Sequence, residues 1–279
     1  MDNDFEKISA TAKPLAYIRA LAHTPIPYCQ RIAELCDAEE AARLFYNGDL
    51  EPARKRAPLV ELRYNSLSGI LTSMSCKNIL ELASGFSPRG LIMTKNPEIR
   101  FVETDLREIL QKKFCIISEL LGPKERPNHR FMSVDALDTD ALMVAARQMR
   151  AGEQATVIHE GLLPYLNLAE KKQLAANIMK LLQIHRGIWI TPDILTKQHH
   201  EEMIAKSPAA QHILKTTGRN LGANLFEDFK SAQDFFIDAG FRVWGWDQME
   251  FVDSINDPSL DEETVQQMSV QQIWAMSPK

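Results

Sequence analysis

Residues 79–91, Ile-Leu-Glu-Leu-Ala-Ser-Gly-Phe-Ser-Pro-Arg-Gly-Leu, decide the fold of this chain. The apolar run 79–82 predicts a buried strand, and residues 83–85 predict a tight turn that opens into a helix. A second strand-like run ends shortly before Asp105, which lies 20 positions after Gly85. A strand, a turn with glycine and a carboxylate about 20 residues further on are typical of a nucleotide-like cofactor site at the edge of a parallel sheet.

Short apolar runs and amphipathic stretches alternate from residue 77 onward. The predicted strands are 78–82, 99–103, 130–134, 155–159 and 187–191, followed by two late runs at 241–246 and 270–276. The predicted helices between them are 105–121, 138–150 and 168–184. Strands that alternate with helices indicate βαβ units and a mainly parallel sheet, so the predicted fold class is α/β.

Two further segments are predicted to cover the sheet. Residues 1–75 show apolar residues at helical spacing and no strand, so we expect a helical cap whose last helix covers 58–73. Residues 195–230 are polar and irregular, and we expect them to form an insertion over the sheet edge and the active site. The whole chain, 1–279, is then a single domain.

The composition is that of an ordinary globular protein, with 45% hydrophobic and 25% charged residues and a formal net charge of −5. A negative net charge argues against a nucleic-acid partner bound by neutralising phosphates. The acidic start has no apolar signal region and no apolar run approaches the length of a membrane span, so we expect a cytoplasmic protein with no membrane partner. The four cysteines lack metal-ligand spacing, and no metal site is expected.

The turn after the first strand distinguishes between two kinds of cofactor. A pyrophosphate requires a glycine-rich turn with free backbone amides, whereas here Phe86, Ser87 and Pro88 follow Gly85, and Pro88 has no amide hydrogen. A bulky turn with few donors suits a cofactor without phosphate at this place. S-adenosylmethionine is such a cofactor, so the turn favours it over NAD.

Carboxylates follow four of the predicted strands: Asp105, Asp135, Glu160 and Asp193. Ligands of open α/β sheets bind outside the carboxyl ends of the strands, so these side chains are candidate ligand contacts. Each of them also suits the ordinary structural role of a helix N-cap or first-turn acid.

A family resemblance rests on four stretches of the chain: 81–86 (Glu-Leu-Ala-Ser-Gly-Phe), 101–105 (Phe-Val-Glu-Thr-Asp), 134–137 (Val-Asp-Ala-Leu) and 160–166 (Glu-Gly-Leu-Leu-Pro-Tyr-Leu). With these stretches the chain resembles the leucine carboxyl methyltransferase-like group of class I methyltransferases, which includes O-methyltransferases of polyketide biosynthesis. The resemblance implies a Rossmann-like, seven-stranded, mostly parallel sheet whose last strand is antiparallel.

The resemblance also implies a set of contacts with S-adenosyl-L-methionine. Glu81 of the first strand and Ala83 and Gly85 of the turn contact the cofactor, with Gly85 under the methionyl part, and Asp105 holds the ribose hydroxyls. Asp135 and Ala136 bracket the adenine, and Glu160 holds the methionyl ammonium side. Arg63 matches the family arginine that grips the cofactor carboxylate, although a surface arginine on an amphipathic helix has the same pattern. Ser84 and the Ser87-Pro88 pair depart from the family pattern.

Two residues near the fourth strand end are candidate catalytic groups. A hydroxyl acceptor usually needs a general base and a carboxylate acceptor needs none. His159 is the candidate base because imidazole titrates near neutral pH, although a histidine in an apolar strand often has only a packing role. Tyr165 is a candidate for the wall of the acceptor pocket.

The predicted function is therefore O-methylation of a small-molecule hydroxyl or a carboxylate by in-line methyl transfer. One alternative is an NAD(P)-dependent Rossmann oxidoreductase, which the missing glycines disfavour. Another is a non-catalytic relative that binds the cofactor. Neither the acceptor nor the oligomeric state follows from the sequence.

Overall fold

The computed structural model describes residues 11–124, 126–255, 257 and 260–279, and it contains a seven-stranded sheet in the order β3-β2-β1-β4-β5-β7-β6. Strands β1 to β5 are parallel, and β7 runs antiparallel to both of its neighbours, β5 and β6. The predicted α/β fold with an antiparallel last strand is confirmed. The strands are β1 (Asn78–Leu82), β2 (Arg100–Asp105), β3 (His129–Ser133), β4 (Ala155–His159), β5 (Gly187–Thr191), β6 (Phe241–Asp247) and β7 (Gln272–Pro278).

Alternate residues of the strands pack on the two faces of the sheet. Leu80, Val157 and Trp189 belong to one buried cluster with helices α8 (Thr139–Ala146), α9 (Leu168–His185) and α12 (Phe229–Asp238). Ile79 and Ile158 belong to a second cluster with helix α5 (Glu51–Ser73). The sheet is therefore covered on both sides, as a parallel sheet requires.

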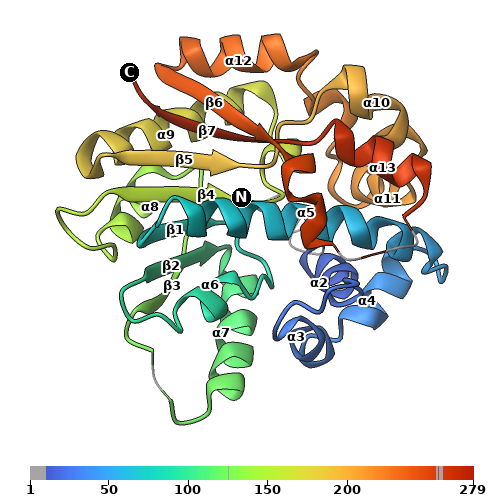
Figure 1. Cartoon of the computed structure of the whole chain (residues 1–279), viewed down its shortest axis with the longest axis horizontal. Coiled ribbons are helices and arrows are strands. Elements are labelled where there is room, and N and C mark those ends of the chain that lie inside the picture. Colours follow the sequence, from blue (N-terminus) through green and yellow to red (C-terminus); the bar gives the residue numbers. More distant parts are fainter. Residues whose placement is uncertain (1–10, 125, 256, 258–259) are drawn as a thin grey trace.

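A third cluster joins the amino-terminal helices to the start of the sheet. Helices α2 (Ala12–Ala20), α3 (Cys29–Leu35) and α4 (Ala38–Phe45) pack with Phe86 of the first turn and with helix α7 (Arg107–Leu121). Figure 1 shows these helices on the side toward which strands β4 and β5 point, together with α10 (Lys197–Lys206) and α11 (Pro208–Thr217). The described part of the cap therefore lies at the carboxyl ends of the strands.

Buried polar contacts dock the 195–230 segment on the loop that follows β4. Lys171, at the start of α9, donates to the carbonyl oxygens of Leu166 and Asn224. Asn224 belongs to the short 3-10 helix η3 (Gly222–Asn224), and its amide donates to the carbonyl of Pro164 at 3.2 Å. Pro164 lies in η2 (Leu163–Tyr165), so the segment covers the loop that carries Tyr165.

Several predicted elements differ from the structure. Strands 78–82, 155–159 and 187–191 are confirmed residue for residue, whereas β2, β3 and β7 are shifted or extended by one or two residues. Helix α5 begins at Glu51 instead of residue 58, because burial of Ala53 and Ala57 stabilises a helical turn that Pro58 alone would interrupt.

The expectation of an irregular 195–230 segment was wrong, because it folds into α10, α11 and η3. The start of α11 carries a recognisable signal, since the Ser207 side chain accepts from Ala210 N and Pro208 occupies the first helical position. Helix α4 was not predicted. Residues 1–10 of the predicted cap lie outside the described residues.

Three further helices belong to the described part of the chain. They are α6 (Arg89–Met93), η4 (Gln248–Ser254) and α13 (Glu262–Ser269). Of the helices in the described part of the chain, none combines the length and the apolar character needed to cross a membrane.

A matched pair of isoleucines tests the packing of the central strand. Ile158 of β4 is 0% exposed and Ile184 of α9 is 62% exposed. We expect Ile158→Ala to lower the free energy of unfolding by about 2–5 kcal/mol, because it leaves a cavity between β4 and α5. Ile184→Ala should change it by less than about 0.5 kcal/mol. Urea denaturation of both variants measures the difference, and equal losses would contradict the described core.

Candidate functional site

The turn after β1 is tied to strand β2 through its backbone. Ser84 N donates to the carbonyl of Thr104 at 2.9 Å, and Gly85 N donates to the Asp105 carboxylate at 2.7 Å. Ala83 and Gly85 adopt left-handed backbone angles, with φ of 50° and 49°. Glycine tolerates such an angle freely and alanine does not, so the hydrogen bonds to β2 must hold Ala83 in place.

Asp105 is the last residue of β2 and shapes the turn. Its second carboxylate oxygen accepts from Leu106 N at 2.7 Å, so both oxygens already bind backbone amides. Burial raises the pKa of Asp105, although the amides of Gly85 and Leu106 oppose the rise. The spacing of 20 residues thus corresponds to a direct contact between Gly85 and Asp105.

A narrow crevice of about 30 Å³ lies beside this turn. From the sheet side it is lined by Glu81, Glu160 and residues 83–87. Helix α2 forms the other wall with Ala12, Leu15 and Arg19. Four of the predicted site residues, Glu81, Ala83, Gly85 and Glu160, are therefore brought together, and Asp105 adjoins them through Gly85.

Three polar atoms of the crevice residues are buried without a hydrogen-bond partner among the described residues. They are Glu81 Oε2, Ser84 Oγ and Arg19 Nε. A buried polar atom without a partner costs free energy, and native proteins contain few of them. The three atoms belong to an anionic, a neutral and a cationic side chain. Together they match a ligand that carries both a positive and a negative charge.

Glu160 is the most strongly paired carboxylate of the site. It accepts from Arg19 at 3.1 Å and from Arg89 at 2.8 Å, and Arg63 Nε lies 3.9 Å away. Burial acts to raise the pKa of Glu160, but Arg19, Arg89 and Arg63 outweigh it and lower the pKa to about 2. The carboxylate is therefore ionised at neutral pH and links α2, α5 and α6 to the end of β4.

Arg89 was not among the predicted site residues, although it lies within the 79–91 stretch. Its guanidinium is 0% exposed and binds Glu81 at 2.5 Å as well as Glu160, and its Nε donates to Ser68 of α5 at 3.2 Å. The same group lies over the Tyr64 ring, 4.6 Å from the centroid. Arg89 thus holds the two carboxylates of the crevice together. The sequence signal was an arginine at the first position of a helix that follows a buried turn.

The pKa of Glu81 is raised above its ordinary value. Burial raises its pKa, and the charge of Arg89 only partly opposes this rise. One oxygen binds Arg89 and the other has no partner among the residues described. The site thus contains a carboxylate that a nearby cation would stabilise in its ionised form.

Asp193, in the loop after β5, organises the loop after β4. Its carboxylate accepts from the backbone amides of Gly161, Leu162 and Leu163 at 2.7–3.2 Å, and it binds the guanidinium of Arg63. Burial acts to raise the pKa of Asp193, but Arg63 and then His159 lower it below its ordinary value. Arg63, the predicted carboxylate ligand, lies between Asp193 and Glu160 and does not line the crevice.

His159 also binds Asp193 and is fully buried. Its Nδ1 lies 2.8 Å from Asp193 Oδ2 and 3.1 Å from Thr191 Oγ1. Because an ionised carboxylate only accepts, Nδ1 carries a proton, and in a neutral imidazole Nε2 is then the nitrogen with the lone pair. Nε2 has no partner among the described residues, and His159 does not line the crevice. The arrangement is a histidine held in one tautomer by a carboxylate.

The other predicted residues lie at neighbouring strand ends. The Tyr165 hydroxyl donates to Thr11 Oγ1 at 3.2 Å, and burial raises the pKa of Tyr165. Asp135 follows β3 and accepts from Leu137 N at 2.9 Å, and the carbonyl of Ala136 accepts from Asn177. These three residues do not line the crevice.

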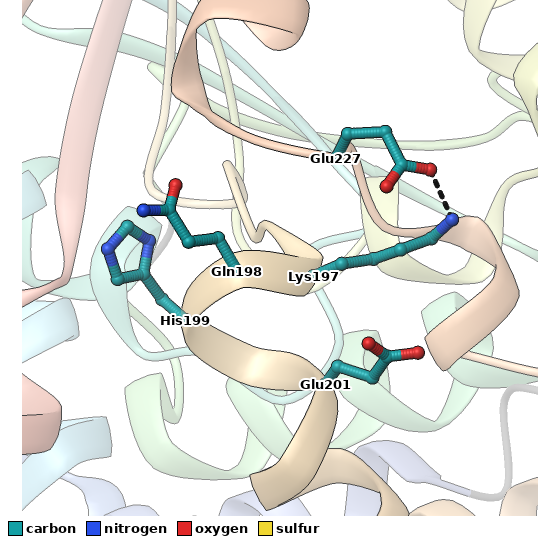
Figure 2. A pocket seen from close by; sticks show the side chains of 5 residues that line it. All are labelled: Lys197, Gln198, His199, Glu201 and Glu227. Carbon is teal, nitrogen blue, oxygen red and sulfur yellow. Dashed lines mark hydrogen bonds and ion pairs between the residues drawn. The ribbon is translucent and has the colours of Figure 1, made fainter.

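A larger hollow of about 520 Å³ lies on the surface of α10 (Figure 2), and it shares no lining residue with the crevice. Its lining is Lys197, Gln198, His199, Glu201 and Glu227, and Lys197 pairs with Glu227 across it. These side chains are mostly exposed, and no apolar wall encloses them. Within the described ranges, no group of three or more histidine, cysteine, aspartate or glutamate residues is placed to hold a metal ion.

Comparison with known structures identifies the class of fold. A DUF574 family protein from Streptomyces avermitilis superposes with a TM-score of 0.59 at 12% identity, over 96% of this chain and 97% of that one. A candidate methyltransferase from Thermobifida fusca gives 0.54 at 13% identity, over 95% and 94%. Magnesium protoporphyrin IX methyltransferase from Synechocystis, with bound S-adenosylhomocysteine, gives 0.51 at 12% identity, over 85% and 92%. The fold is that of the class I methyltransferases.

The sequence itself is similar to one family model. Residues 60–179 match the family model described as leucine carboxyl methyltransferase. This region contains β1 to β4 and all the crevice residues except those of α2. The resemblance is confirmed over these residues, which make up less than half of the 279-residue chain. No curated protein matches the sequence.

The depressed pKa of Glu160 predicts a stability change in acid. A carboxyl group whose pKa falls from 4.5 unfolded to about 2 folded stabilises the fold above pH 4.5 and loses this contribution as the pH falls toward 2. We expect the stability difference between the wild type and Glu160→Gln to shrink by about 2 kcal/mol between pH 6 and pH 3. Urea denaturation at several pH values measures it.

The control for this prediction is Glu39→Gln, which removes an exposed pair with Arg43 on α4. Exposed ion pairs contribute little to stability, so the difference between this variant and the wild type should stay small across the range. A pH-independent difference for Glu160→Gln would show that the carboxylate is not held ionised by its arginines.

Proposed function

We propose that this protein is an S-adenosylmethionine-dependent methyltransferase that methylates an oxygen of a small-molecule hydroxyl or of a carboxylate. The observation that carries the proposal is the crevice at the carboxyl ends of β1 and β4, where Glu81 Oε2, Ser84 Oγ and Arg19 Nε have no hydrogen-bond partner among the residues that the structure describes. A zwitterionic methionyl group has an ammonium for Glu81 and a carboxylate for Arg19 and Ser84. The family match and the absence of a phosphate-binding glycine turn support the same reading.

The residues present fit the cofactor chemically. Glu81 and Asp105 both have raised pKa values, so both are stabilised by a ligand that brings positive charge or hydroxyl donors. Asp105 remains the proposed contact of the ribose, and Asp135 with Ala136 the proposed surroundings of the adenine. Glu160 and Arg63 remain proposed contacts of the methionyl part. Each of them must release a side chain that it binds in this structure before it can contact the cofactor.

Admission of the cofactor requires a change at helix α2. Small-molecule sites usually measure roughly 300–1,000 Å³, far more than the volume of about 30 Å³ in this crevice. The wall that must yield is formed by Ala12, Leu15 and Arg19, since the opposite wall is the buried turn and strand end. We infer that residues 1–75 and 195–230 work as parts of a single methyltransferase domain that closes over the site.

Bound S-adenosylmethionine supplies an electrophilic methyl group on a sulfonium. The task of the protein is then to align the acceptor oxygen and exclude water, and alignment alone can contribute roughly 7–11 kcal/mol. Asp193 binds His159 Nδ1, and Nε2 has no partner among the described residues, so a neutral His159 has the arrangement of a general base with its orienting carboxylate. Tyr165, near the cap, is the proposed wall of the acceptor pocket.

Isothermal titration tests the cofactor directly. We expect S-adenosylhomocysteine to bind the wild type and NAD not to bind. Asp105→Ala should weaken S-adenosylhomocysteine binding by roughly a hundredfold. The substitution removes the proposed contact with the ribose, and it also removes the hydrogen bonds that the carboxylate accepts from the amides of Gly85 and Leu106. The matched control is Asp247→Ala, since Asp247 is also the last residue of a strand and caps a backbone amide. NAD binding without S-adenosylhomocysteine binding would rule out the proposal.

Turnover separates the two acceptor classes. With phenolic acceptors we expect His159→Gln to lower turnover by about 10²–10⁴-fold, while the affinity for S-adenosylhomocysteine changes by less than twofold. With carboxylate acceptors the same variant should keep its turnover, because a carboxylate needs no deprotonation. Methyl-transfer assays against a panel of both acceptor types measure this. Unchanged turnover with a phenol would remove His159 as the base.

A further inference from the structure

A second buried ionic cluster lies beneath the turn and outside the crevice. Glu103 of β2, Lys113 of α7 and His129 of β3 have side chains that are at most 1% exposed. Lys113 Nζ pairs with one oxygen of Glu103, and His129 Nε2 lies 2.9 Å from the other. Burial acts to raise the pKa of Glu103, but Lys113 and His129 lower it below its ordinary value, so the carboxylate is ionised.

Lys113 reaches beyond this cluster to the cofactor turn. Its ammonium donates to the carbonyl oxygen of Ser84 at 3.2 Å, while the amide of Ser84 donates to Thr104. Both backbone polar groups of Ser84 are thus fixed from below. Its hydroxyl is left without a partner in the described part of the chain, and the residue lines the crevice. On this geometry we propose that Lys113 is a positioning residue that sets the Ser84–Gly85 turn for the methionyl part of the cofactor.

Packing alone does not account for the cluster. A buried ion pair gains little over well-packed apolar side chains, because desolvation of both charges offsets their attraction. The contact that an apolar side chain at position 113 cannot replace is the hydrogen bond to the Ser84 carbonyl. The contact with the turn therefore explains why position 113 has a charged side chain. Glu103 in turn compensates the buried charge of Lys113.

Gly90 shows what the cluster demands of its surroundings. A Cβ at position 90 would lie 2.1 Å from Glu103 Oε1 and 2.6 Å from His129 Nε2. Glycine in a helix is less stable than alanine by roughly 0.5–1 kcal/mol, yet it stands in the five-residue helix α6. The 79–91 stretch therefore carries a glycine whose role is to admit the Glu103–His129 contact.

The role of Lys113 toward the cofactor rests on the proposed function, but its contact with the turn does not. Ala83 and Gly85 flank Ser84 in left-handed conformations, and Ala83 would leave this conformation in a free turn. Without Lys113, the Ser84 carbonyl keeps only its bond from the Ser87 amide at 3.1 Å, so the turn gains freedom that cofactor binding must then remove. The loss should fall on ligands with a methionyl or homocysteinyl part and spare adenosine, which does not reach the turn.

The test uses Lys113→Met combined with Glu103→Gln, so that no charge is left unpaired in the core. We expect the double variant to bind S-adenosylhomocysteine roughly tenfold more weakly, with adenosine affinity unchanged within about twofold. Amide hydrogen exchange at Ser84 and Gly85 should become faster in the ligand-free protein. The matched control is Lys112→Met, because Lys112 is the exposed neighbour of Lys113 on α7 and should leave all three readouts unchanged.

Each outcome bears on one hypothesis. Equal weakening of S-adenosylhomocysteine and adenosine, or no weakening of either, would overturn the positioning role of Lys113. Unchanged exchange at Ser84 and Gly85 would overturn it as well. If the wild type binds no S-adenosylhomocysteine, the proposed function fails, and exchange at the turn still decides whether Lys113 holds it.

Discussion

The ion pairs of Glu160 are the interaction on which the site depends. A single buried carboxylate at the end of β4 joins Arg19 of α2, Arg63 of α5 and Arg89 of α6. Removing one partner from a buried pair leaves an uncompensated charge and costs several kcal/mol, so these elements hold one another in position. The cap is therefore fixed to the sheet by charge at the site itself as well as by the apolar cluster behind it.

Three buried ionic groups at the strand ends each fix a different element in position. Glu160 fixes the cap, Asp193 fixes the loop after β4, and Lys113 with Glu103 fixes the turn after β1. All three lie outside the apolar pattern that folds the sheet. Apolar side chains would serve a purely structural core at these positions. The buried charges therefore belong to the candidate functional site and not to the scaffold that supports it.

The sequence predicts the sheet better than its cover. Strands β1, β4 and β5 are rich in apolar residues because both faces of the sheet are covered, and such short runs are recognisable in the sequence alone. The helices of 195–230 are polar, and docking contacts such as Lys171 with Asn224 stabilise them, so periodicity did not show them. At the site, Gly85 and Asp105 followed from their spacing along one βαβ unit, and Glu81 followed from the family resemblance. Arg19 did not, because it comes from α2 and meets Glu160 only in the folded chain.

The charges of the crevice explain how one site can be both closed and ready for a zwitterion. Arg19, Arg63 and Arg89 face Glu81, Glu160 and Asp193, so the cluster is balanced in the closed form. A ligand with a carboxylate and an ammonium offers Arg19 a new anion and Glu160 a new cation, so the Arg19–Glu160 pair can be exchanged without leaving a buried charge unpaired. Glu81, whose pKa burial raises, then has a cation beside its free oxygen. A neutral ligand of the same shape would break the pair and replace neither charge, so under the proposed function the arrangement that holds α2 in place favours a zwitterionic ligand.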